Sequence, residues 1–215
     1  MRHQGSIISK VKGDPLAYLW LKPFQMWQRV HKALCSLWTY LLAKAKGVDI
    51  ASMPVCAGVP YIFRSPYSTI RIGRHFQANS SFKSNNIGIL SRSRLTTNDH
   101  GAAIIIGDNV GISAATISAF RRIVIGDHTL IGGNVLITDS DWHPLDPAMR
   151  RIPFAEGRCA DVVIGSNVFI GTRSIILKGV TIGDNSVIGA GSVVTRDIPA
   201  NVIAAGNPCV VVKHL

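Results

Sequence analysis

The chain has 215 residues and is 47% hydrophobic, which suits one sizeable core and excludes a disordered tail. Its 23 Lys and Arg residues against 12 Asp and Glu residues give a net charge of +11, which suits an anionic ligand or surface. No zinc-finger, RNA-recognition or basic-region pattern is present, so nucleic acid is not expected as a partner. The four cysteines form no C-x-x-C pair, which favours a reduced cytoplasmic protein with no metal required.

A helical pattern runs through the basic, aromatic-rich segment 1–60. Asp14 and Pro15 read as an N-cap followed by proline at the first helical position, and Lys44, Lys46 and Gly47 read as a helix end. Pro23 lies inside this helical pattern and predicts a kink or a break. Between these ends apolar residues recur at helical spacing: Leu16, Leu19, Trp20, Trp27, Val30, Leu34, Leu37, Trp38 and Leu41.

Two interpretations of this helical segment stay open. It packs on the remainder of the protein, or residues 14–46 make peripheral contact with an anionic membrane, where Trp and Lys are favourable at the interface. The second interpretation would place a cytoplasmic protein at the inner face of the cytoplasmic membrane. The longest uncharged run in the first fifty residues, 33–43, has eleven residues and is too short to span a bilayer, which takes about 20.

An aliphatic residue every six positions dominates the rest of the chain, residues 61–213. The pattern starts at Ile72, continues through Ile106 and Ile112, and resumes at Ile125, Ile131 and Ile137. Its longest unbroken run is Ile164, Ile170, Ile176, Ile182, Ile188 and Val194. A period of six fits neither a helix nor an ordinary sandwich.

Short strands separated by tight corners explain this period. Every sixth residue then points inward and stacks on its equivalent one coil away, while corners such as Gly183-Asp184-Asn185 supply the backbone freedom of a bend. Three strands per coil make a triangular prism with an aliphatic core. We therefore predict an all-β parallel β-helix that carries a short N-terminal α-helical segment.

The repeat resembles that of the hexapeptide-repeat acyltransferase superfamily, whose prisms are left-handed. The resemblance covers about residues 70–213, and it is most specific in the run from Ile176 to Thr195 and in Ala205-Gly206-Asn207-Pro208. These segments are similar to the sugar O-acetyltransferase branch, which includes maltose, galactoside, nodulation-factor and surface-polysaccharide acetyltransferases. The resemblance implies a bacterial homotrimer with active sites between neighbouring subunits.

The six-residue period fails between Ile137 and Ile164, which lie 27 residues apart. The stretch of about 139–161 contains several prolines and acidic residues, so we predict a loop thrown out from the prism. Functional groups concentrate on loops that a rigid scaffold holds.

His143 is the candidate general base in this loop. Pro144 disfavours helical geometry at position 143, and a carboxylate, Asp141 first and Asp139 second, would orient the imidazole. The resemblance assigns His143 the catalytic role, in which it takes the proton of an acceptor that attacks acetyl-CoA directly. Trp142 and Asp139 are expected to bind the substrate, although Trp142 packing the loop remains an equal alternative.

Coenzyme A contacts follow from the resemblance alone. They fall on the backbones of Thr172 and Ala190, on the Thr195-Arg196 pair, and on Lys213, which would meet a phosphate. Val210 departs from the family pattern, where this position is basic. Asn79 lies in a family-like F-x-A-N segment, but extra coils separate it from the loop and no role is carried over.

These observations predict an acetyl-CoA-dependent O-acetyltransferase that acts on a saccharide acceptor, in surface polysaccharide biosynthesis. N-acetylation of an amino sugar remains the alternative, because the base and the co-substrate would be the same. A metal-dependent β-helix enzyme and a non-catalytic scaffold are remoter alternatives.

Overall fold

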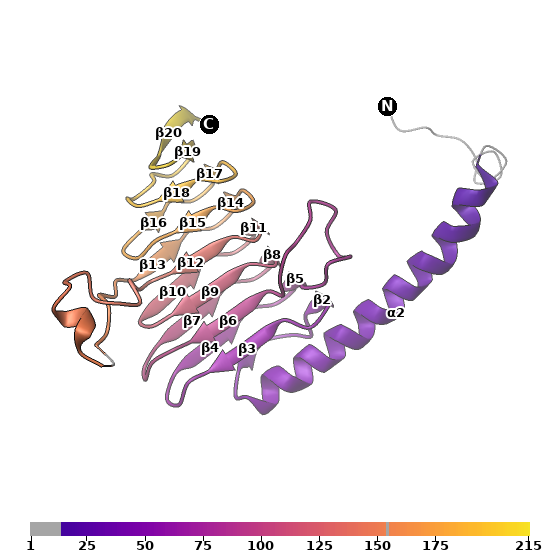
Figure 1. The fold of residues 1–215 in the computed structure, drawn as a ribbon. Coiled ribbons are helices and arrows are strands. Elements are labelled where there is room, and N and C mark those ends of the chain that lie inside the picture. The colour runs from indigo at the N-terminus through magenta and orange to yellow at the C-terminus, as the bar shows by residue number, and fades with distance from the viewer. Residues whose placement is uncertain (1–13, 154) are drawn as a thin grey trace.

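The computed structural model describes residues 14–153 and 155–215. Three sheets of short strands form the faces of a left-handed, three-sided β-helix, and one long helix projects from its N-terminal end (Figure 1). The fold class predicted from the six-residue period is confirmed.

Sheets A and C each contain six strands, all parallel. Sheet A consists of β1 (Asp49–Ile50), β4 (Thr69–Ile72), β7 (Ala103–Ile106), β10 (Arg122–Ile125), β13 (Val162–Ile164) and β16 (Thr181–Ile182). Sheet C consists of β3 (Tyr61–Arg64), β6 (Arg94–Thr97), β9 (Thr116–Ala119), β12 (Leu136–Thr138), β15 (Ile175–Ile176) and β18 (Val193–Val194).

Sheet B contains eight strands and ends in an antiparallel pair, β19 with β20. It consists of β2 (Val55–Ala57), β5 (Gln77–Asn79), β8 (Gly111–Ser113), β11 (Leu130–Gly133), β14 (Phe169–Ile170), β17 (Val187–Ile188), β19 (Val202–Gly206) and β20 (Cys209–His214). The antiparallel β20 closes the C-terminal end, where the chain stops adding coils to the prism.

The aliphatic residues of the repeat form the core of the prism. Val163 pairs with Thr181 and Ile164 with Ile182, eighteen residues along, so one coil holds three hexads. All six residues of the longest run are at most 1% exposed: Ile164, Ile170, Ile176, Ile182, Ile188 and Val194. Burying an Ile side chain contributes about 1.5–3 kcal/mol, and the repetition of this contribution along the prism holds the coils together.

Two different residues serve each tight corner. At the corner after β16, Asn185 adopts the left-handed conformation with φ +59°, which Asn tolerates better than most residues. Gly183 has another task, because a Cβ there would collide with the backbone nitrogen of Ala200 in the next coil. The bend therefore belongs to the asparagine, and the glycine permits the close approach of successive coils.

The N-terminal segment is a single helix, α2 (Pro15–Ala45), and the predicted caps are confirmed. Asp14 Oδ1 accepts the N–H of Ala17 at 3.1 Å, and Gly47 has φ +70° beyond the last turn. The predicted break at Pro23 is wrong, since the helix continues through it. Pro23 is exposed, so water can satisfy the carbonyl that the missing N–H leaves without a partner.

The residues of α2 that are buried against the prism all lie in its C-terminal half: Cys35, Ser36, Thr39 and Ala43. The Oγ of Ser36 accepts the backbone N–H of Cys56 in β2 at 2.9 Å. The first coil begins at Asp49, so residues that we assigned to the N-terminal segment 1–60 already belong to the prism. Among the described residues, no helix is long and apolar enough to cross a bilayer.

Candidate active site

The excursion between β12 and β13 is the predicted loop, and it leaves the prism at the corner between sheets C and A (Figure 1). An antiparallel bridge between Ser140 and Cys159 closes its base. The N–H of Asp141 adds a hydrogen bond of 3.0 Å to the carbonyl of Arg158. The loop therefore has a fixed neck, and one turn of 3-10 helix, Met149–Arg151, lies beyond it.

Asp139 holds the neck to the prism and does not face a substrate. It is fully buried, and its carboxylate accepts the backbone N–H groups of Phe120, Arg121 and Arg122 at 2.6–2.8 Å. Burial raises the pKa of this carboxyl, although the three N–H donors oppose the shift. The predicted substrate-binding role of Asp139 is wrong, because both of its oxygens are occupied by the backbone.

Trp142 is anchored to the prism at one edge and half exposed at the other. Its indole Nε1–H donates to Thr138 Oγ1 at 3.1 Å, and its ring meets Phe120 edge to face with centroids 4.9 Å apart. Its φ of +63° is uncommon for a bulky residue and places the next residue, His143, beyond a sharp bend. Trp142 thus packs the loop and also borders the cleft beside His143.

His143 lies exposed at the rim of a cleft of about 530 Å³. Its backbone N–H donates to the carbonyl of Asp141 at 2.7 Å, and within the described part of the chain its imidazole makes no hydrogen bond. The ring nitrogens are therefore available to a ligand in the cleft. Trp142, Pro144, Arg150, Arg151, Ile152, Pro153, Ala155 and Glu156 also line this cleft.

Asp141 forms an ion pair that the sequence did not reveal. Its Oδ1 lies 2.9 Å from the Nζ of Lys178, which sits at the same corner of the prism in the following coil, and both side chains are largely buried. Its Oδ2 is buried without a hydrogen-bond partner among the described residues. One oxygen thus fixes the carboxylate, and the other is free to accept an N–H. The role of Asp141 in orienting His143 stays a prediction.

Gly157 allows the two limbs of the loop to lie against each other. A Cβ at this position would lie 2.8 Å from the backbone nitrogen of His143 and 2.9 Å from that of Trp142. Any side chain at 157 would therefore displace the segment that carries His143. No sequence pattern indicates this contact, since the two limbs meet only in the folded loop.

Thr172 and Ala190 occupy equivalent positions at the corner between sheets B and C, one coil apart. The carbonyl of Thr172 accepts the N–H of Gly191 at 2.8 Å, and Thr172 Oγ1 donates to the carbonyl of Gly133 at 2.6 Å. Ala190 is exposed. The backbone contacts with coenzyme A that we predicted for both residues stay a prediction.

Thr195 and Arg196 follow β18 and lie exposed at the other edge of sheet C, the edge from which the loop with His143 emerges. Sheet C therefore lies between the two groups of predicted coenzyme A residues. Lys213 lies apart from both, since it pairs with Ile203 near the far end of β20. Val210 pairs with Ala205, nearer to Ala190, and about 10 Å of extended strand separates it from Lys213.

Asn79 lies on sheet B, where its side-chain amide donates to Ser113 Oγ at 3.1 Å. It borders two other cavities and not the cleft of His143. Within residues 14–153 and 155–215, no cluster of three or more His, Cys, Asp or Glu side chains could hold a metal ion.

Sequence reasoning missed the two arginines of the His143 cleft and the lysine that pairs with Asp141. Arg150 and Arg151 line this cleft, and their adjacency within a loop was the signal that could have found them. Lys178 had no such signal, because it occupies an ordinary corner position of the repeat.

Comparison with known proteins finds the same fold in a solved structure and similar sequences among sugar acetyltransferases. Residues 161–196 match the family described as bacterial transferase hexapeptide (six repeats). The structure of AntD, an N-acyltransferase from Bacillus cereus in complex with dTDP and 3-hydroxybutyryl-CoA, aligns with a TM-score of 0.59 at 18% identity. The alignment covers 81% of this chain and 87% of AntD, and at that identity it shows the fold alone.

Two galactoside O-acetyltransferases are similar in sequence. That of Escherichia coli is 44% identical over 115 residues, which are 51% of this chain and 56% of the relative. That of Lactococcus lactis is 46% identical over 93 residues, which are 43% of this chain and 44% of the relative. The matches thus span about half the length of these relatives. The resemblance to the sugar O-acetyltransferase branch of the hexapeptide-repeat superfamily is confirmed over that part.

Proposed function

We propose that this protein transfers an acetyl group from acetyl-CoA to a hydroxyl group of a saccharide, with His143 as the general base. The observation that carries the proposal is the placement of His143 with its imidazole unengaged at the rim of a cleft, on a loop whose neck is pinned to the prism. The similarity to galactoside O-acetyltransferases supports the reaction class.

In this mechanism the His143 imidazole accepts the proton of the acceptor hydroxyl while that oxygen attacks the thioester carbonyl. The proton then passes to the departing coenzyme A thiolate, so no covalent enzyme intermediate is needed. Asp141, held by Lys178, has a second carboxylate oxygen that can accept the imidazole N–H and stabilise the imidazolium. Such a base contributes about 10²–10⁴-fold to the rate.

In this proposal acetyl-CoA binds along the two edges of sheet C. The pantetheine arm would lie at the corner of Thr172 and Ala190, and Arg196 adds a positive charge at the other edge. Lys213 stays a predicted phosphate contact, at a more distant place. These residues bind and orient the co-substrate, so that the acceptor and the thioester meet in one geometry.

The acceptor we propose is an anionic saccharide of surface polysaccharide biosynthesis. Arg150 and Arg151 bring two positive charges to the cleft against the single Glu156, which favours an acceptor with a phosphate or carboxylate group. A cytoplasmic location follows from the sequence and stays a prediction. Acetylation of an amino sugar is the alternative, because the same base could deprotonate an amine.

The decisive experiment incubates the full chain with acetyl-CoA and a panel of neutral, phosphorylated and amino sugars, and measures the release of free thiol. We expect His143→Ala to lower kcat by about 10²–10⁴-fold. His100→Ala is the matched control, since His100 is an exposed histidine outside the cleft. Full activity of His143→Ala would refute the assignment of the base.

The acetylated product then distinguishes the two acceptor groups. Mild alkali removes an O-acetyl ester and leaves an N-acetyl amide, so mass spectrometry before and after treatment reads the bond that formed. Alkali-stable product alone would replace the proposed reaction by the alternative. A non-catalytic scaffold would be favoured if none of the sugars in the panel caused thiol release and the protein did not bind acetyl-CoA.

A further inference from the structure

Most of the apolar face of α2 points away from the prism, and only its edge, at Trp27 and Trp38, borders cavities shared with the prism. Nine large apolar residues at helical spacing are each between 48% and 78% exposed: Leu16, Leu19, Trp20, Trp27, Val30, Leu34, Leu37, Trp38 and Leu41. We call them the outer face of α2. Packing an amphipathic helix on its own protein normally buries such residues. Here the opposite side, with Ser36 and Thr39, makes the contact.

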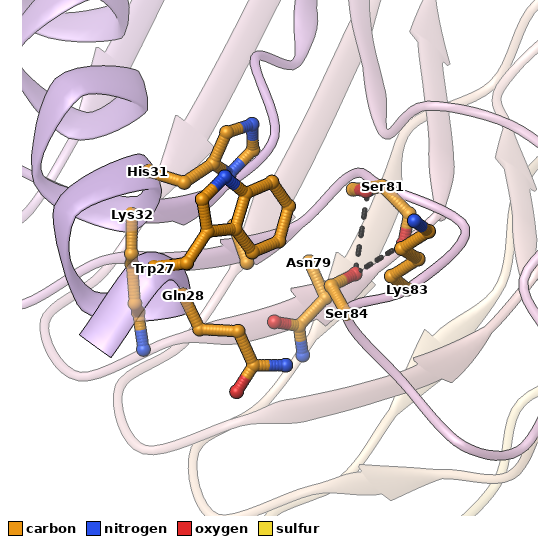
Figure 2. Close-up of a pocket in the computed structure, with 9 residues that line it drawn as sticks. Trp27, Gln28, His31, Lys32, Asn79, Ser81, Lys83 and Ser84 are labelled. Carbon is orange, nitrogen blue, oxygen red and sulfur yellow. Dashed lines mark hydrogen bonds between the residues drawn. The ribbon is translucent and has the colours of Figure 1, made fainter. Parts of the chain in front are cut away.

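The rest of the inward side of the helix is mostly polar, with Trp27 at its edge. Figure 2 shows Gln28 and His31 of the helix around a cavity of about 160 Å³, with Asn79 and Ser84 of the prism on its other side. The prism thus contacts mainly small and polar residues of α2, with Trp27 and Trp38 at the border of the contact. The helix then runs on beyond the prism toward its N-terminus (Figure 1).

The charges of α2 all have one sign. The helix contains Lys22, Arg29, Lys32 and Lys44 and no acidic residue, and all four cations are exposed. Long basic side chains beside an apolar face can reach anionic headgroups while the face itself enters the acyl region. This combination of Trp, Leu and cations is complementary to a negatively charged lipid surface.

Pairing with a second helix fits the outer face less well. Coiled coils bury a narrow apolar seam and use charged pairs at the flanking positions to set the partner. The flanks of this face carry further apolar residues, Phe24 and Met26, and both are exposed. Two copies would also bring like charges together. A helix that is about 46 Å long and too polar to span the bilayer lies instead in the plane of the interface.

We infer that α2 docks this protein on an anionic lipid surface, with its outer face in the interface and the prism held on the aqueous side. The helix joins the prism at the first coil, so docking would restrict the candidate active site to acceptors at or near that surface. This inference is independent of the reaction that His143 performs.

Vesicle co-sedimentation of the full chain tests the docking. We expect binding to phosphatidylcholine vesicles that contain phosphatidylglycerol, weaker binding to phosphatidylcholine alone, and weakening by salt. The double variant Trp20→Glu/Leu34→Glu changes only exposed side chains. We expect its affinity for the vesicles to fall by about tenfold or more. Blue-shifted tryptophan fluorescence on vesicle addition should disappear in parallel.

Tyr67→Glu is the matched control, because it places the same charge at an 85% exposed aromatic residue outside α2. Its vesicle binding should equal that of the wild type. Equal pelleting of the double variant and the wild type, or no binding to either vesicle, would overturn the inference. A loss of oligomer mass in the double variant, without a change in vesicle binding, would assign the outer face to a second copy instead.

Discussion

The carboxylate of Asp139 decides where the candidate catalytic loop begins. Its three backbone donors belong to the corner between β9 and β10, so the residue joins the loop to the preceding coil. An amide at this position would turn its NH₂ group toward a backbone N–H and lose at least one of these hydrogen bonds. Both terminal atoms of this side chain must accept hydrogen bonds from the backbone, and a carboxylate can do so whereas an amide cannot.

We therefore expect Asp139→Asn to destabilise the protein by about 1–3 kcal/mol and to lower Tm by several degrees. Thermal unfolding followed by circular dichroism measures the change. Asp146→Asn is the control, since Asp146 is an exposed carboxylate of the same loop with a single local backbone contact. An unchanged Tm combined with a raised KM for the acceptor would return Asp139 to the substrate site.

The candidate site shows which residues a sequence can reveal. His143 was found because it interrupts a regular repeat and because the histidine matches the family pattern. Asp141 was ranked before Asp139, but their different roles could not be predicted, since both precede His143 and their partners appear only in the fold. Lys178 and Gly157 act through contacts that cross from one coil or limb to another, and no local pattern records them.

At the scale of elements, the attachment of α2 depends on a few small residues over β2. Cys56 lies in β2 below the helix, with its N–H bound to Ser36, and it is fully buried. Burial raises the pKa of its thiol to about 11. A thiol with a raised pKa in the folded state contributes stability that is complete below its ordinary value near 9 and is lost as the pH rises through about 11.

We expect the free energy of unfolding to fall by about 2 kcal/mol between about pH 8 and pH 11 because of this thiol. Urea titrations of the wild type and Cys56→Ala at both ends of this range measure the difference. Other groups titrate in the same range, so the comparison of the two proteins isolates Cys56. The same pH-dependent loss in Cys56→Ala would show that the thiol does not cause it.

The elements also show why the strands were easier to predict than the place of the helix. A period of six fixed both the buried positions and the corners, since each buried residue stacks on its equivalent in the next coil. The helix was predicted from its own pattern, but the side that meets the prism was not. Small residues such as Ser36 and Ala43 make that contact, and they carry no hydrophobic signal.

For the molecule as a whole, the outer surfaces of the prism faces carry apolar side chains that a lone prism leaves in water. On sheet B, Leu130 pairs with Phe169 in the neighbouring strand, and both are about half exposed. On sheet C, Tyr61 and Phe63 are exposed to a similar degree. Contiguous apolar surface of this kind is typical of protein interfaces. We propose that it is covered in a homotrimer, as the family resemblance implies.

A trimer of this chain would have a mass of about 70 kDa, from three chains of 23.2 kDa, and light scattering coupled to gel filtration should find it. Phe169→Glu would place a charge in the apolar contact, so we expect this variant to elute as a monomer. Its acetyl transfer should fall with it if the site needs a neighbouring subunit, because residue 169 lies on sheet B and not beside His143.

Val163→Glu is the control on sheet A, where the side chain is 38% exposed. A wild type of 23 kDa with full activity would contradict the trimer. A monomeric, folded Phe169→Glu that keeps its kcat would show that each chain carries a complete site.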